Sequence, residues 1–125
     1  MWSVSKADGS AVSDFVLVAF PMLAIFVATT SLAFGSYAQL VLLDSTIEGA
    51  RYAALADQDI FSGIARTKNL VAAGLGPAIS VDVKGTVLRI GTLESIRFES
   101  TLGINLIPGT RIFTASSVAT REGEY

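Results

Sequence analysis

Apolar residues are concentrated in one long run near the N-terminus. Residues 15–34 read FVLVAFPMLAIFVATTSLAF, and no charged residue lies between Asp14 and Asp44, a gap of 29 positions. As an α-helix, twenty residues extend about 30 Å, which is the thickness of the hydrocarbon core of a bilayer. Because backbone groups find no water in lipid, a helix is the conformation that a single span requires. The run therefore predicts a transmembrane helix at about 15–34, with a mild kink at Pro21.

A cleaved secretory signal peptide is the alternative interpretation of this run. However, the run is longer than the 7–15 apolar residues typical of a signal peptide, and Lys6 is the one basic side chain before it. We therefore expect a retained span. Lys6 and the N-terminal amine precede the run, whereas Asp44 and Glu48 are the first charges after it. This small positive excess predicts a cytoplasmic N-terminus and a C-terminal part outside the cytoplasm.

The helical pattern continues past the apolar run. One apolar stripe recurs at spacings of three and four residues and consists of Leu40, Leu43, Ile47, Ala50 and Ala54. A second, polar stripe consists of Asp44, Glu48 and Arg51, in which Glu48 and Arg51 are close enough to pair. We expect one helix from Phe15 to Leu55. Its apolar stripe needs a partner, which is either the protein's own globular part or a neighbouring subunit.

After Leu55 the pattern predicts a second short helix and then strands. Asp57 or Asp59 can cap a helix over about 60–73, which Gly74 and the pair Gly76-Pro77 would end. Alternation with period two then predicts four or five short strands, with Gly85 at a turn, over residues 79–84, 86–90, 93–100, 102–107 and 111–120. Their charges are expected on a solvated sheet face and are Lys84, Arg89, Arg97 and Glu99.

These elements define an α+β fold class. A long N-terminal helix, transmembrane at first and then amphipathic, is expected to pack on a small antiparallel β-sheet, together with the second short helix. The corresponding organisation of the chain is a leader segment at 1–9, a long helix at 10–56 and a small extracytoplasmic α+β domain at 57–125.

Composition narrows the chemistry that the chain can support. Its 125 residues include no histidine and no cysteine, which removes the commonest general base, thiolate catalysis, disulfides and most transition-metal sites. The net charge of −2 provides no basic surface for nucleic acid. Asp57 and Asp59 could contribute to a calcium site, but helix capping explains them better. We expect neither an enzyme nor a protein that needs a cofactor.

A short segment before the apolar run carries a more specific signal. Gly9 precedes the small residues at 10–13, which are followed by Asp14 and Phe15. A carboxylate at the start of a membrane helix is costly unless a cation offsets it. Cleavage after Gly9 would create such a cation, the amine of Ser10, and the amine of one subunit can then neutralise Asp14 of the next. The alternative is that Asp14 caps the helix.

Two segments resemble a known family. GSAVSDFVLVAFPML at 9–23 and EGARYAAL at 48–55 resemble the TadE-like proteins, which are pilin-like subunits of bacterial tight-adherence (Tad/Flp) pilus systems. The resemblance covers about the first 55 residues, and the family usually has Glu where this chain has Asp14. It implies a type IV pilin-like fold and a minor pilin or pseudopilin that takes part in pilus assembly and is held in the cytoplasmic (inner) membrane by a single span.

The same resemblance implies partners and site residues. A prepilin peptidase would cleave between Gly9 and Ser10, and the N-terminal helix would assemble with other pilin-like subunits and the major Flp pilin as a homo- or hetero-oligomer. The implied assembly residues are Asp14, Phe15, Glu48 and Arg51. The alternative function is a membrane-anchored extracytoplasmic binding module unrelated to pili. An anchored enzyme is the least favoured class, because the usual catalytic residue types are missing.

Overall fold

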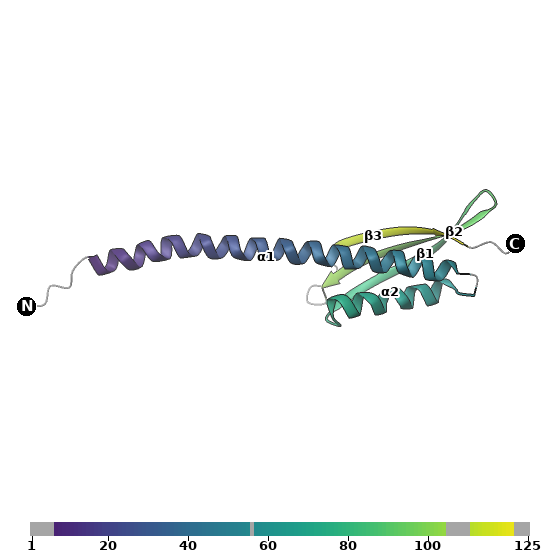
Figure 1. The fold of residues 1–125 in the computed structure, drawn as a ribbon, viewed down its shortest axis with the longest axis horizontal. Helices are drawn as coiled ribbons and strands as arrows, with labels where there is room; N and C mark the ends of the chain where they lie inside the picture. The colour runs from purple at the N-terminus through teal and green to yellow at the C-terminus, as the bar shows by residue number, and fades with distance from the viewer. Residues whose placement is uncertain (1–6, 56, 105–110, 122–125) are drawn as a thin grey trace, which may run out of the picture. The chain divides into compact units, whose positions relative to one another are not determined.

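The computed structural model describes residues 7–55, 57–104 and 111–121. These residues form the helices α1 (Ala7–Ala54) and α2 (Ile60–Leu75) and the strands β1 (Ile79–Ile90), β2 (Leu93–Ile104) and β3 (Arg111–Thr120), as Figure 1 shows. The strands form an antiparallel sheet in the order β1-β2-β3. The predicted α+β class is thereby confirmed. The chain divides into two units, of which unit 1 ends at Ser36 and unit 2 begins at Tyr37, so α1 contributes to both.

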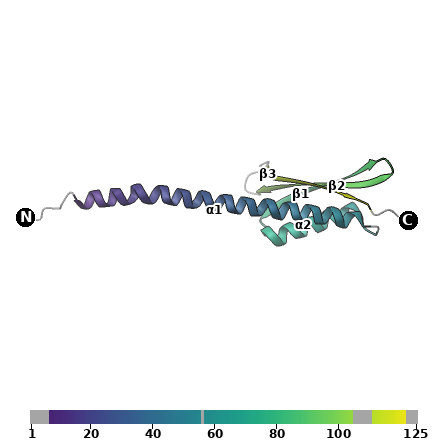
Figure 2. The same cartoon turned by 45° about the horizontal axis from the view of Figure 1, so that its top comes forward.

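In unit 2 the two helices cover one face of the sheet (Figure 2). The core has two clusters. One contains Ala38, Leu42, Val71, Leu102 and Ala115, and the other contains Ala50, Ala53, Ala54, Val83, Ile96 and Phe98. The earlier residues of α1 in unit 2 therefore pack near Leu102 of β2, and the later ones pack near Ile96. It follows that α1 runs parallel to β1 and β3 and antiparallel to β2.

The strands are longer and fewer than the sequence predicts. Gly85 does not begin a turn but lies inside β1, opposite Phe98 of β2. A Cβ at Gly85 would collide with the Ile60 side chain of α2 and would lie 2.9 Å from Cε1 of Phe98. The glycine is thus required by a close approach between layers. The actual turn is at Gly91, whose φ of 66° favours glycine. The strand predicted at 102–107 begins as part of β2 and ends outside the described residues.

Because β1 is one continuous strand, the four charged residues expected on one face of the sheet do not all lie on it. Side chains alternate along a strand, so Lys84 and Arg89 point to opposite faces of the sheet. Lys84, Arg97 and Glu99 are exposed as expected. Arg89 is exposed as well, but on the other face, where it pairs with Glu94 at 3.5 Å. Glu94 also pairs at 3.3 Å with Arg121, which directly follows β3.

The helices α1 and α2 cross closely at two glycines. A Cβ on Gly63 would lie 2.5 Å from the Ala53 Cβ and 2.6 Å from the Gly49 carbonyl oxygen, and a Cβ on Gly49 would collide with the Thr67 hydroxyl. This proximity explains why the predicted apolar stripe of α1 is only partly buried. Mostly small residues, together with Leu42, occupy the covered face, whereas Leu40 and Leu43 are 65% and 38% exposed.

Replacing Gly63 with alanine tests this helix crossing. Gly63→Ala places a methyl group against backbone and against a buried ring, and such overpacking costs about 1–3 kcal/mol, only partly offset by the better helix propensity of alanine. We expect a lower melting temperature by circular dichroism in mild detergent. Gly74→Ala is the matched control on α2, because its methyl group meets only the side chain of Val41, which can adjust. Equal melting temperatures for the two variants would contradict the close crossing.

Candidate functional site: the exposed apolar part of α1

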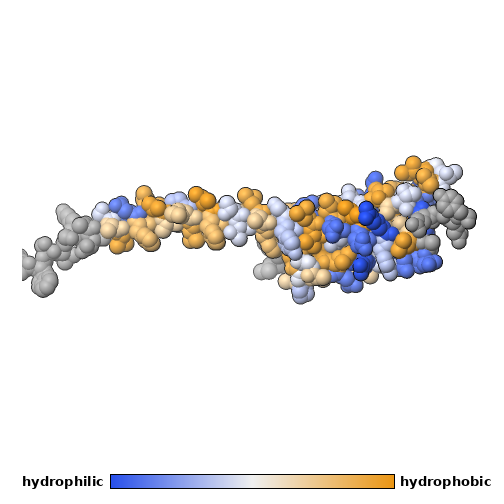
Figure 3. Space-filling view, in the orientation of Figure 1, coloured by the Kyte–Doolittle hydropathy of each residue, from blue (hydrophilic) through white to orange (hydrophobic). Residues whose placement is uncertain are grey.

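Within unit 1, α1 presents large apolar side chains on all sides. Phe15, Leu17 and Phe20 are 72%, 77% and 74% exposed, and the surface of this segment is predominantly apolar in Figure 3. Among the described residues, α1 is the one helix long and apolar enough to cross a membrane. An apolar surface of this extent is not stable in water and needs lipid or protein around it. The predicted span at 15–34 therefore lies in a continuous helix that passes through Pro21.

Hydroxyl groups inside the apolar run bond to the helix backbone. Thr30 donates to the carbonyl of Phe26 at 2.8 Å, and Ser31 donates to the carbonyl of Val27 at 2.7 Å. Such bonds to the preceding turn satisfy the hydroxyl hydrogen without water. The polar residues near the end of the run are thus compatible with an apolar environment.

Gly9 and Ser10 lie in the first turns of α1. The helix begins at Ala7, both residues are exposed, and the Ser13 hydroxyl donates to the Gly9 carbonyl at 3.0 Å. A Cβ at Gly9 would meet no atom within 4 Å. Packing in this chain therefore does not require a glycine at position 9, in contrast to Gly63 and Gly85.

Asp14 and Phe15 lie side by side in sequence on the exposed helix. Asp14 is seven residues beyond Ala7, so it is inside α1 and is not the residue that caps it. The alternative interpretation of Asp14 as a helix cap is thus wrong for the full chain. Its carboxylate has no ion pair or hydrogen bond within the described residues, and Phe15 is free to contact lipid or another chain.

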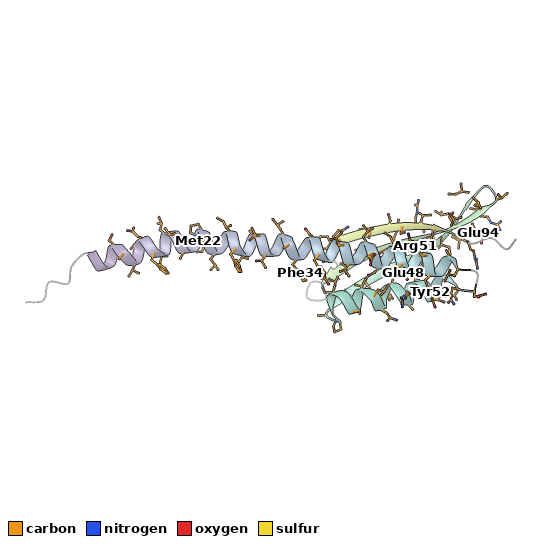
Figure 4. The ribbon with its side chains drawn as sticks, viewed as in Figure 1. Met22, Phe34, Glu48, Arg51, Tyr52 and Glu94 are labelled. Carbon is orange, nitrogen blue, oxygen red and sulfur yellow. The ribbon has the colours of Figure 1, made fainter. Side chains whose placement is uncertain are left out.

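Glu48 and Arg51 lie on the part of α1 in unit 2 (Figure 4). Glu48 pairs with Arg66 of α2, with 3.8 Å between Oε1 and Nη2, rather than with Arg51. Both paired side chains are about half exposed, so the pair contributes little to stability. Arg51 is exposed and has no ion pair among the described residues. The sequence could not reveal the actual partner of Glu48, because Arg66 is on another helix.

Asp59 is the N-cap of α2, as the capping interpretation predicts. Its carboxylate accepts hydrogen bonds from the Ser62 hydroxyl and from the Ser62 backbone N–H, the latter at 2.8 Å. These two bonds, the hydroxyl first, lower the pKa of Asp59 below its usual 3.8. The described residues contain no group of three or more acidic side chains that could hold a metal ion.

The fold and this helix define a class: an α+β protein with an apolar N-terminal helix of membrane-spanning length. No family model matches the chain, and no match was found among curated proteins or solved structures.

The cap at Asp59 predicts a pH-dependent contribution to stability. Because its pKa is lowered in the folded state, the contribution is present above the unfolded value near 3.8 and is lost as the pH falls through the lower folded value. We expect Asp59→Ala to lower the melting temperature at pH 7, and the difference from the wild type to shrink below about pH 4. Asp57→Ala is the control, since Asp57 is exposed and does not cap α2. A difference that stays constant from pH 7 to pH 2.5 would show that the charge of Asp59 is irrelevant.

Proposed function

We propose that this protein is a membrane-anchored, pilin-like subunit, a minor pilin or pseudopilin that takes part in assembly of a Tad/Flp-type pilus. The observation that carries the proposal is the continuity of α1, whose exposed apolar segment leads directly into the α+β unit without a loop. The resemblance at 9–23 and 48–55 supports the same function. In this proposal the protein acts by binding other subunits and has no catalytic role.

The proposed location is the cytoplasmic membrane. The span at about 15–34 holds the chain in the bilayer, the N-terminus faces the cytoplasm and unit 2 lies outside, where it can enter a pilus. The span alone gives a hydrophobic anchor, and the small charge difference across it sets the orientation.

Processing at Gly9 is the first proposed step. A prepilin peptidase would cut between Gly9 and Ser10, which lie in the exposed first turns of α1. Glycine costs a helix about 1 kcal/mol relative to alanine, so this turn opens readily for a protease. The open space around Gly9 supports the idea that a protease, and not packing, requires the glycine.

Asp14 is the proposed assembly contact. Its carboxylate is exposed at the edge of the apolar run and has no cation beside it among residues 7–55, 57–104 and 111–121, so the new amine of Ser10 on a neighbouring subunit would be its counter-charge. Phe15 would contribute apolar contact with the same neighbour, and Glu48 and Arg51 would add polar contacts farther along α1. The major Flp pilin and other pilin-like subunits are the proposed neighbours.

A membrane-anchored binding module is the second candidate. One observation favours it: an open pocket of about 250 Å³ in unit 2, lined mainly by apolar residues such as Ile60, Val87 and Ile96 and by Arg121. A binding module would require neither cleavage after Gly9 nor a charge at Asp14, so the two following experiments distinguish the candidates.

Cleavage is tested at Gly9. In cells that contain the cognate peptidase, we expect the mature protein to begin at Ser10, and Gly9→Leu should leave the N-terminus at Met1 because a bulky side chain obstructs the protease. Intact-mass spectrometry of the purified membrane protein measures the difference. Ala11→Leu, two residues beyond the cut, is the control and should still be processed. A wild-type protein that retains Met1 beside an active peptidase would contradict this step.

The charge of Asp14 is tested by two substitutions. A charged residue within a membrane helix costs roughly 2.5–3.5 kcal/mol, and less near the edge, so Asp14→Ala should insert at least as well as the wild type. We expect this variant to lose pilus assembly, and Asp14→Glu to retain or improve it, because the charge remains and the side chain reaches farther. A membrane-fraction blot and a count of surface fibres separate insertion from assembly. Normal fibre numbers with Asp14→Ala would exclude the proposed contact.

A further inference from the structure

The strand β3 leaves one edge of the sheet open. Arg121 donates its backbone N–H to the Glu94 carbonyl at 2.8 Å, so in the alternating antiparallel ladder the even-numbered residues of β3 direct their backbone groups away from β2. Gln39 of α1 donates to one of these outer carbonyls, that of Thr114, at 3.4 Å. The outer backbone groups of Ser116 and Val118 have no partner within the described part of the chain.

Beyond its first two residues, this edge lacks the usual protection against pairing. Natural edge strands carry charges or proline, or are bent by a bulge, because an open edge is a template for another strand. The strand begins with Arg111 and a bulge at Ile112, where two residues of β3 face one step of β2. Residues 113–120 read FTASSVAT, without charge or proline. The edge is thus suited to receive a strand.

An apolar stripe of α1 lies on the same side of unit 2. Gln39, which reaches β3, is followed at helical spacing by Leu43 and Ile47, and Leu40 belongs to the same stripe. The opposite side of α1 faces α2, where Val41 lies against Gly74 and Glu48 pairs with Arg66. Leu40 and Leu43 are exposed, and Figure 3 shows apolar surface on this part of α1.

The opposite side of unit 2 offers a second open edge, that of β1, whose residues include Asp82, Lys84 and Arg89. The outer edge of β1 has no backbone hydrogen bond to another described segment, and α2 beside it exposes Phe61, Ala65 and Ala72. Because β1 and β3 are both antiparallel to β2, they run in the same direction. Two copies with the same orientation can therefore join β3 of one to β1 of the next as a parallel pair.

The membrane anchor selects this arrangement over a two-fold dimer. An antiparallel β3–β3 pair would invert one copy, because a two-fold axis normal to the sheet reverses every element of the partner. The chain enters unit 2 at Tyr37, directly after the proposed span, so two copies held by one membrane present that end to the same bilayer. Only the parallel arrangement keeps both anchors in place.

The alignment of the strands within the sheet indicates a register for the pair. Lys84 of β1 is aligned with Glu99 of β2, and Glu99 with Ser116 of β3, so these residues form one row across the sheet. A neighbouring copy that continues this row has its Lys84 opposite Ser116 of the first copy. Both side chains lie on the face away from the helices, and the outer backbone groups of Ser116 then meet those of Val83 and Gly85. At this register, therefore, the side chains of the two strands alternate in step, and the outward backbone groups of one strand meet those of the other.

We propose that copies of this chain associate side by side, with the β3 edge and the stripe of Leu40, Leu43 and Ile47 in one copy packed against the β1 edge and α2 of the next. The occupant of the surface is a second copy. Only the common orientation of the copies rests on the proposed function. Because the two contacting surfaces differ, the contact can repeat and form rows or rings.

Cysteine cross-linking tests the register. Because the sequence has no native cysteine, every disulfide between copies joins introduced cysteines. Two differently tagged full-length copies, one with Ser116→Cys and one with Lys84→Cys, are produced together in cells without other pilus components, and their membranes are oxidised. Adjacent parallel strands bring Cα atoms within the 4.4–6.8 Å that a disulfide spans, so we expect a mixed dimer containing both tags. Ser116→Cys combined with Arg97→Cys on the central strand is the control and should give none.

Leucine substitution tests the helix part of the surface. Leu43→Glu should reduce the mixed dimer at least fivefold, whereas Leu55→Glu should not, although Leu55 is similarly exposed, at 43% against 38%. Leu55 follows the end of α1 and is outside the stripe. Circular dichroism of both variants checks that they fold.

Two outcomes would overturn the association. One is a dimer between two Ser116→Cys copies without the mixed dimer, which indicates an antiparallel pair, and the other is no dimer from folded, membrane-inserted protein. Since the assay contains no pilus, its failure is distinct from a loss of fibres.

Discussion

Unit 2 depends on one tight contact, the insertion of the Phe98 ring between two backbones. The ring is fully buried, its Cζ would lie 2.8 Å from a Cβ on Gly63 of α2, and its Cε1 would lie 2.9 Å from a Cβ on Gly85 of β1. Both glycines are necessary because protein interiors have no spare volume for two more methyl groups. The same contact brings α2 onto α1 at Gly49, so helix crossing, sheet covering and core filling are consequences of a single packing arrangement.

The parts of the fold that depend on local sequence were predictable. The apolar run, the cap of α2 at Asp59 and the period-two alternation after Ile79 each arise from neighbours in the chain, and the structure confirms them. Gly85 shows the limit of such reasoning. Gly85 was expected to begin a turn, but it makes room for Phe98 and Ile60, which are distant in sequence, as a glycine inside a strand often does. Once Gly85 is placed inside β1, the face assigned to Arg89 changes as well.

In the candidate site, the exposure of side chains was predictable from the sequence, but their pairing was not. The position and exposure of the apolar run, Gly9 and Asp14 follow from sequence, because no tertiary contact is needed to leave a helix uncovered. The pairing of Glu48 with Arg66 was not predictable, since it depends on how α2 crosses α1. The proposed roles of Asp14 and Phe15 depend on other chains, for which both exposed side chains are available.

The apolar stripe of α1 divides between the two partners that the sequence leaves open, since Ala50 and Ala54 are buried in the core whereas Leu40 and Leu43 are exposed. The covered face of α1 is built mostly from small side chains, including Ala38, Thr46 and Ala53, together with the fully buried Leu42. Leu40 and Leu43 lie outside this face, on the side nearest β3. These two exposed leucines therefore indicate an external contact, in contrast to Leu42, which belongs to the core. Their position beside the uncharged residues 113–120 of β3 gives one surface both apolar area and backbone hydrogen-bonding groups, the two requirements for extending a sheet from one subunit to the next.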